Sequence, residues 1–279
     1  MKKSLLIYIL TAIFLIGCSN TNENINDKKE TTENPPITEN KETSEKPGNK
    51  NTSNSLSKEE LFNKLADEAS LESYKSDGIT EEIHNAESEN PVVVSKSEGY
   101  VEFKEEPNVY HALYDSYHES VGNMEMEYYN NDTIMVYRKD NSGWVEASLE
   151  KDGAGAYNLS DTNKNRNSVL KELEKYYTIT ETDDAYIASL ESTPENVYEI
   201  RDAMMGNVED QIFIGELQSI KTNHKFDKQT LYPISHDWEM RFNTDSDGVV
   251  LFKETANYKE VNEVKEIVIP EEVKAMLCK

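Results

Sequence analysis

Apolar and polar residues alternate with a period of two over several stretches of the chain, and this pattern limits the fold more than any other feature. The clearest run is Met-Glu-Met-Glu-Tyr-Tyr at residues 124–129. Similar runs flank the turn signals at residues 140–143 and 245–248. Alternation places successive side chains on opposite faces of a strand. Strands joined by short turns, with no helix between them, indicate an antiparallel meander.

Helices are predicted at a few marked positions. Ser57 and Glu60 have the spacing of a capping box, and Leu56 and Leu61 flank them as a hydrophobic staple, so a helix of about three turns should begin here. We also expect helical segments at 169–177 and 194–204, a short strand at 267–269 that Pro270 stops, and a terminal helical turn. Together these features predict an α+β domain with one large antiparallel sheet.

The N-terminus has the pattern of an export signal. Lys2 and Lys3 precede an almost purely apolar run from Leu5 to Ile16, which is shorter than the roughly 20 residues that a spanning helix needs. Leu15-Ile16-Gly17-Cys18 resembles the lipobox of bacterial lipoproteins, in which the signal is cut before the cysteine and its thiol receives a diacylglyceryl group. We therefore expect residues 1–17 to be a signal peptide and Cys18 to be lipidated. The alternatives are an uncleaved anchor, or a plain signal peptide with a chance cysteine.

Residues 18–57 form the second predicted region. From Ser19 onward the segment is rich in Asn, Thr, Glu, Lys, Ser and Pro, and it has few large apolar residues. Such a composition buries too little surface to offset chain entropy, so we expect a disordered tether with a span of roughly 35 Å. The folded domain is then expected to occupy residues 58–279. If Cys18 is alkylated, Cys278 has no cysteine left to pair with.

The formal net charge is −25, from 54 acidic and 29 basic residues. This charge opposes binding to nucleic acid, which depends on neutralising phosphates, and it opposes adsorption to an anionic membrane surface. The lipid on Cys18 is then the expected membrane attachment, on the outer face of the cell membrane, and we expect a monomer. The acidity also has a simpler interpretation, which is that it keeps an exported protein soluble.

Several local phrases resemble a family of Gram-positive surface lipoproteins of unassigned function, similar in shape to the LolA, LppX and LprG carriers. The phrases are Tyr128-Tyr129-Asn130-Asn131-Asp132, Ser142-Gly143-Trp144-Val145, Asp227-Lys228-Gln229-Thr230-Leu231-Tyr232-Pro233 and Ile269-Pro270-Glu271-Glu272-Val273. The resemblance implies an incomplete, strongly curved antiparallel barrel with helices packed on its concave face. Relatives of that shape hold lipids or acylated proteins in the concavity.

Four methionines are candidates for contact with an apolar ligand: Met124, Met126, Met204 and Met205. A methionine side chain is flexible and fills irregular space, which suits a cavity with a variable occupant. The alternative is that all four are ordinary core residues. Tyrosine is also abundant, with 16 copies, and its amphipathic ring suits both a cavity mouth and strands in general.

The segment 243–254 follows the calcium-loop pattern of oxygen ligands with a glycine at the sixth position. Asn243, Asp245, Asp247 and Glu254 are its candidate ligands, and Gly248 is the glycine. However, the preceding residues alternate like a strand, so the helix that normally enters such a loop is missing. The alternative is a plain hairpin in which Asp and Gly form the turn.

No motif for catalysis or nucleotide binding is found in the sequence. His111 and His118 are seven apart and should lie on opposite faces of a strand, while His84, His224 and His236 are isolated and are expected at the surface. We therefore expect a non-enzymatic, membrane-tethered domain that needs no cofactor and binds a lipid or another hydrophobic ligand. The alternative is a protein-binding sensor or assembly module of the cell envelope.

Overall fold

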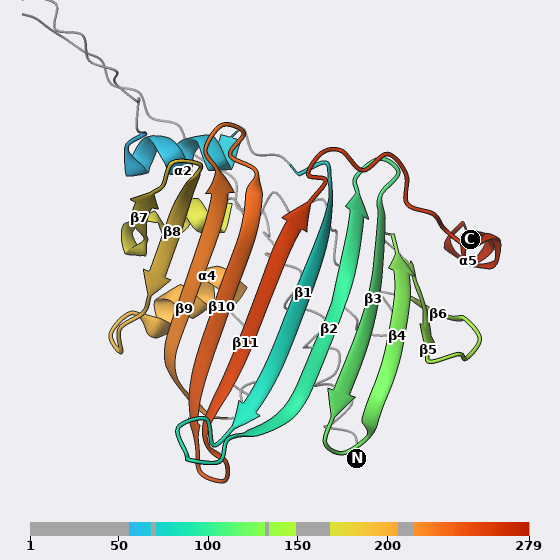
Figure 1. The fold of residues 1–279 in the computed structure, drawn as a ribbon, viewed down its shortest axis with the longest axis horizontal. Coiled ribbons are helices and arrows are strands. Elements are labelled where there is room, and N and C mark those ends of the chain that lie inside the picture. The colour runs from blue at the N-terminus through green and yellow to red at the C-terminus, as the bar shows by residue number, and fades with distance from the viewer. Residues whose placement is uncertain (1–55, 68–70, 132–133, 149–167, 206–214, 279) are drawn as a thin grey trace, which may run out of the picture.

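A computed structural model describes residues 56–67, 71–131, 134–148, 168–205 and 215–278. Within these residues an 11-stranded antiparallel sheet dominates the structure, with the strand order β6-β5-β4-β3-β2-β1-β11-β10-β9-β8-β7 (Figure 1). The sheet does not close, because β6 and β7 are its two edges. The prediction of one large antiparallel sheet is confirmed.

The strands are β1 (Ser73–His84), β2 (Val92–Lys104), β3 (Val109–His118), β4 (Gly122–Asn130), β5 (Ile134–Lys139), β6 (Val145–Ser148), β7 (Thr178–Glu181), β8 (Ala185–Glu191), β9 (Glu216–Asp227), β10 (Pro233–Thr244) and β11 (Gly248–Lys259). The helices are α2 (Lys58–Asp67), α4 (Val197–Met205) and α5 (Glu271–Leu277), with a 3-10 turn η1 (Glu174–Tyr176). A further helical turn covers residues 168–172.

Two meanders form the sheet. One runs from β1 to β6 and the other from β7 to β11, and each strand in them pairs with the next along the chain. The first strand of one meander pairs with the last strand of the other, so β1 and β11 lie side by side at the centre of the sheet (Figure 1). Their register runs from Lys75 opposite Lys259 to Ile83 opposite Leu251.

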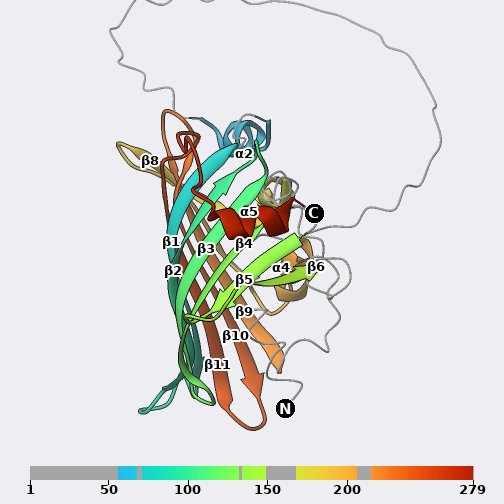
Figure 2. The same ribbon diagram turned by 90° about the vertical axis from the view of Figure 1, so that its right-hand side faces the viewer.

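The sheet bends toward the side that carries α2 and α4 (Figure 2). We call this side the concave face. Directly paired residues on neighbouring strands point to the same face, so the register assigns each strand residue to one side. Residues Ala188, Leu190, Ile220, Met240 and Phe242 of β8 to β10 lie on the concave face, where they belong to the same cluster as the helices.

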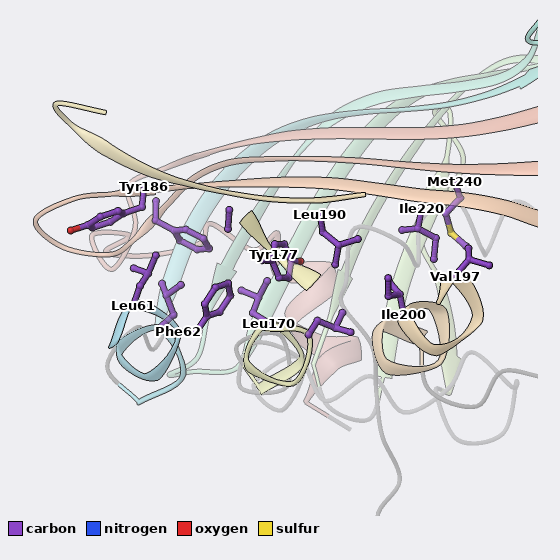
Figure 3. Packing of buried hydrophobic residues seen from close by; sticks show 14 of the residues in the cluster. Leu61, Phe62, Leu170, Tyr177, Tyr186, Leu190, Val197, Ile200, Ile220 and Met240 are labelled. Carbon is purple, nitrogen blue, oxygen red and sulfur yellow. The ribbon is translucent and has the colours of Figure 1, made fainter. Parts of the chain in front are cut away.

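The first hydrophobic cluster fills the concave side of β8 to β10 (Figure 3). Its helical members include Leu61 and Phe62 of α2 and Ile200 of α4, all 0% exposed. The predicted capping box orients α2: Ser57 N donates to Glu60 Oε2 at 2.8 Å, and Glu60 N donates to Ser57 Oγ at 3.2 Å. Two orphan N–H groups are thereby satisfied, and the apolar stripe of α2 faces the sheet.

The second cluster lies on the concave side of β1 to β4. It is mainly aromatic, and its buried aromatic members are Tyr74, Phe103, Tyr110, Tyr114 and Tyr128. Among the described residues no helix contributes to this cluster, since its remaining buried members are strand residues and Leu71. In the part of the chain that the structure describes, helices therefore pack on one half of the concave face and not on the other.

The third cluster lies on the convex face and corrects two expectations. Val109, Tyr129 and Val136 alternate with the concave residues of their strands, and Val273 of α5 packs with them. The resemblance implied that the helices pack on the concave face. Helix α5 instead covers the convex face. Residues 267–269 have no strand pairing; Ile267 packs into this cluster, so burial of its side chain, not sheet pairing, fixes the segment.

Among the described helices, none is both long enough and apolar enough to cross a membrane.

Candidate functional site

Polar side chains cross the middle of the concave face in two neighbouring rows. One row contains Tyr114, Gly99, Gly78, Ala256, His236, His224 and Ala188, and the next contains Ser116, Ser97, Thr80, Glu254, Trp238, Thr222 and Leu190. These rows connect the second cluster, through Tyr114, with the first, through Ala188 and Leu190. We call the polar members the polar track; they are Ser116, Ser97, Thr80, Glu254, His236, His224 and Thr222.

Glu254 is the most deeply buried charged residue of the polar track, at 2% exposed. Its Oε1 lies 2.8 Å from His236 Nε2, and His236 Nδ1 lies 3.1 Å from Tyr258 Oη. Within the described part of the chain, Glu254 Oε2 has no hydrogen-bond partner. Burying a carboxylate is costly unless both oxygens are compensated, so this oxygen has an unused capacity to accept a hydrogen bond.

Glu82 gives a direct comparison on the same face. It is 5% exposed, its Oε1 lies 2.7 Å from His84 Nε2, and its Oε2 accepts from Ser95 Oγ at 3.4 Å. Both oxygens of Glu82 therefore have partners, whereas only one oxygen of Glu254 does.

Tyr114 forms an aromatic wall beside the polar track. Its ring lies over Gly99 of the neighbouring strand, where a Cβ atom would be 2.6 Å from Tyr114 Cδ1 and 2.1 Å from Leu113 O. Burial raises the pKa of Tyr114 well above its ordinary value, and the charges of Tyr128 and Glu254 act in the same direction. Tyr114 and Glu254 lie in neighbouring rows of the concave face.

The other tyrosines extend this wall. Tyr128 stacks on Tyr114 and on Tyr110, with ring centroids 6.1 and 5.6 Å apart. Tyr74 meets Tyr258 edge-on at 5.4 Å, and Tyr258 in turn contacts His236. An aromatic surface and a buried polar group therefore adjoin each other.

The structure separates the four candidate methionines. Met124 and Met126 lie on the concave face of β4, opposite Ser116 and Tyr114 at the ends of the two rows. Met204 packs against the first cluster from α4. The side chain of Met205 lies outside the described residues.

The calcium-loop candidates do not converge. Asp245 and Asp247 lie in the tight turn between β10 and β11, and Thr244 Oγ1 accepts from Asp247 N at 3.0 Å. Asn243 pairs with Val249, while Glu254 pairs with Trp238 farther along the hairpin and bonds to His236. No group of three or more His, Cys, Asp or Glu side chains that could hold a metal ion occurs among the described residues. The geometry is that of the hairpin alternative.

The three histidines that were expected at the surface are less exposed than predicted. His111 and His118 are buried, and His84, His224 and His236 are partly buried. His111 and His118 do lie on opposite faces, as predicted. On the convex side His111 lies between Glu102 Oε2 at 3.0 Å and Glu127 Oε1 at 3.1 Å, and stacks on Tyr129 at 4.2 Å. The chain carries no local motif for this network, because strand pairing alone assembles it.

A separate pocket of about 440 Å³ lies at the β7 edge of the sheet, beside the start of α2. Its lining mixes polar and apolar residues: Leu56, Lys58, Tyr177, Thr178, Ile179, Glu181 and Tyr186. None of the predicted site residues is among them. The concave face, which holds Met124, Met126 and Glu254, remains the candidate site.

Fold and site together define an open half-barrel domain with a polar track across its concave face. Residues 57–276 match a family described as "Family of unknown function (DUF6612)", and the chain belongs to that family. The expected membership of a family without an assigned function is thereby confirmed.

Among solved structures, the chain is similar to a DUF1329 family protein from Desulfovibrio piger, with 11% identity, a TM-score of 0.26, and coverage of 72% of this chain and 90% of that one. It is also similar to a beta-barrel-like protein of domain of unknown function DUF1849 from Brucella abortus, with 8% identity, a TM-score of 0.22, and coverage of 68% and 97%. No curated protein sequence matches the chain significantly.

The placement of Tyr114 over Gly99 predicts a large effect of a small substitution. Gly99→Ala should lower the free energy of unfolding by about 1–3 kcal/mol, because the added methyl group meets a backbone carbonyl and a packed ring. Gly143→Ala is the matched control, since nothing lies within 4 Å of its Cβ position, and it should change stability by less than about 0.5 kcal/mol. Urea unfolding followed by circular dichroism measures both, and equal stability of the two variants would contradict the placement.

Proposed function

We propose that this protein is a lipid-anchored, non-enzymatic lipoprotein of the cell envelope that binds a hydrophobic ligand on the concave face of its half-barrel. The observation that carries the proposal is the contrast between the two halves of that face. Helices α2 and α4 pack on β8 to β10, whereas the aromatic cluster on β1 to β4 includes no residue from a described helix. The buried side chains of that cluster are apolar and at most 9% exposed, so an acyl chain would insert among them.

The side chains on this half suit a variable occupant. Met126 packs against the aromatic cluster and Met124 lies two residues away on the same strand face, and methionine adapts its shape at little cost. The tyrosine rings add a large apolar area with polar ends. The polar track next to them supplies a place for the polar end of a ligand, so the face is matched to an amphiphile.

The proposed location rests on the N-terminal sequence. A diacylglyceryl group on Cys18 would bring two acyl chains, which is what stable anchoring requires. Residues 18–57 would then act as a tether, and the acidic charge of −25 would keep the domain away from an anionic bilayer surface. Cys18 is therefore the proposed point of membrane contact.

Native mass spectrometry tests ligand binding directly. Residues 19–279, expressed in bacteria and purified without detergent, should carry an additional mass that organic extraction removes and that corresponds to a lipid. As a control, Ala112→Trp places a large ring on the concave face, where Ala112 is 0% exposed, and should reduce the bound fraction in the protein that still folds. A clean mass of the protein alone, even after incubation with lipid vesicles, would contradict binding and favour the protein-binding alternative.

Lipidation is tested separately, in cells. With Cys18 present, the full chain should incorporate an alkyne-labelled fatty acid and sediment with membranes. Cys18→Ser should abolish the label, because serine has no thiol to alkylate, while Cys278→Ser should leave it unchanged. Labelling that survives Cys18→Ser would show that the anchor lies elsewhere.

A further inference from the structure

Glu254 presents a specific imbalance between hydrogen-bond donors and acceptors. Its carboxylate is buried in the middle of the concave face, and His236 compensates only Oε1, at 2.8 Å. The backbone N–H groups of the surrounding strands are used in the ladders that pair β1 with β11 and β10 with β11. Oε2 has no partner among the described residues. A buried acceptor that makes no hydrogen bond lowers the stability of the folded state.

Among the described residues, the two rows of the polar track supply no permanently charged cation to Oε2. Between β3 and β8, the two rows of the polar track contain no lysine and no arginine. The basic side chains in these rows are His236, which already faces Oε1, and His224, whose Nε2 lies 2.9 Å from Thr222 Oγ1. A positively charged group that pairs with Oε2 therefore has to come from outside these rows.

Aromatic rings surround the same position. Trp238 is the direct partner of Glu254 on β10, Tyr258 contacts His236, and Tyr114 lies in the neighbouring row. Aromatic faces attract cations as well as apolar groups. A carboxylate among aromatic rings is thus matched to an ammonium group, and it disfavours a ligand that ends in a carboxylate.

We propose that Glu254 Oε2 accepts a hydrogen bond from the ammonium group of an amphiphilic ligand whose apolar chain inserts into the aromatic cluster of β1 to β4. This inference rests on the proposed function, because it assumes that the concave face binds a hydrophobic ligand. It adds the chemical class of the polar end and the residue that selects it.

Three probes with the same number of carbon atoms separate the contribution of the headgroup to the affinity from that of the alkyl chain. They are dodecylamine, 1-dodecanol and dodecanoate. Calorimetric titration of residues 19–279, below the critical micelle concentrations and in 0.3 M NaCl to screen the overall charge, should give the tightest binding for dodecylamine. We expect its affinity to exceed that of 1-dodecanol by about tenfold or more, since one charge-assisted hydrogen bond contributes at least that much. Dodecanoate should bind most weakly.

Glu254→Gln tests the residue, because it preserves the volume and removes the charge. It should lower the affinity for dodecylamine about tenfold and change that for 1-dodecanol by less than about threefold. Glu82→Gln is the matched control: Glu82 is also buried on this face, but both of its oxygens have partners, so its substitution should leave the headgroup preference intact. If Glu254→Gln does not fold, the preference of the unaltered protein for dodecylamine over 1-dodecanol still decides the question.

The outcomes distinguish the two proposals. Equal binding of dodecylamine and 1-dodecanol to the unaltered protein, or an equal loss of preference in Glu82→Gln and Glu254→Gln, would overturn the role of Glu254 and leave ligand binding in place. The absence of binding for all three probes would overturn the proposed function itself.

Discussion

The pairing of β1 with β11 is the contact on which the rest of the structure depends. These strands come from the two ends of the described domain, and their register joins two meanders into one sheet. The pairing places Thr80 opposite Glu254 and Gly78 opposite Ala256. Without it, the aromatic cluster of β1 to β4 and the helix-covered cluster of β8 to β10 would belong to separate sheets, and the polar track would not be continuous.

The polar track has a physical cost that an apolar face would avoid. Replacing buried polar groups by well-packed apolar residues is often neutral or stabilising, so a buried carboxylate with an unpartnered oxygen is a departure from the most stable core. Such departures are expected where a site serves a ligand and not only stability. The convex face differs, because the buried His111 there has a carboxylate partner on both ring nitrogens.

Much of the fold follows from the sequence, because alternation and turn signals are local. The hairpin at residues 245–248 and the capping box at Ser57 and Glu60 have the predicted geometry. Strand β9 was not predicted, because its concave-face positions include Thr222 and His224 in place of apolar residues, which hides the alternation. The segment 267–269 is apolar like a strand, but Ile267 and Ile269 pack on the convex face and Val268 is 78% exposed.

The candidate site could be predicted only in part. Met124 and Met126 were identified and do lie on the concave face. Glu254 was also identified, but as a calcium ligand, because a loop pattern describes neighbours along the chain. Its actual partner is His236, and Tyr114 lies in the neighbouring row, on a strand of the other meander. Which residues surround Glu254 depends on the register between strands and on which face of the sheet is concave. Neither property can be read from a single segment of the sequence.

Methyl NMR of methionine-labelled protein tests the concave-face site most directly. Met124 and Met126 lie on the concave face of β4, while Met276 of α5 packs against the convex cluster. If the ligand binds where we propose, adding dodecylamine should shift the Met124 and Met126 methyl signals and leave that of Met276 unchanged. Shifts at Met276 with none at Met124 and Met126 would contradict a ligand site on the concave face.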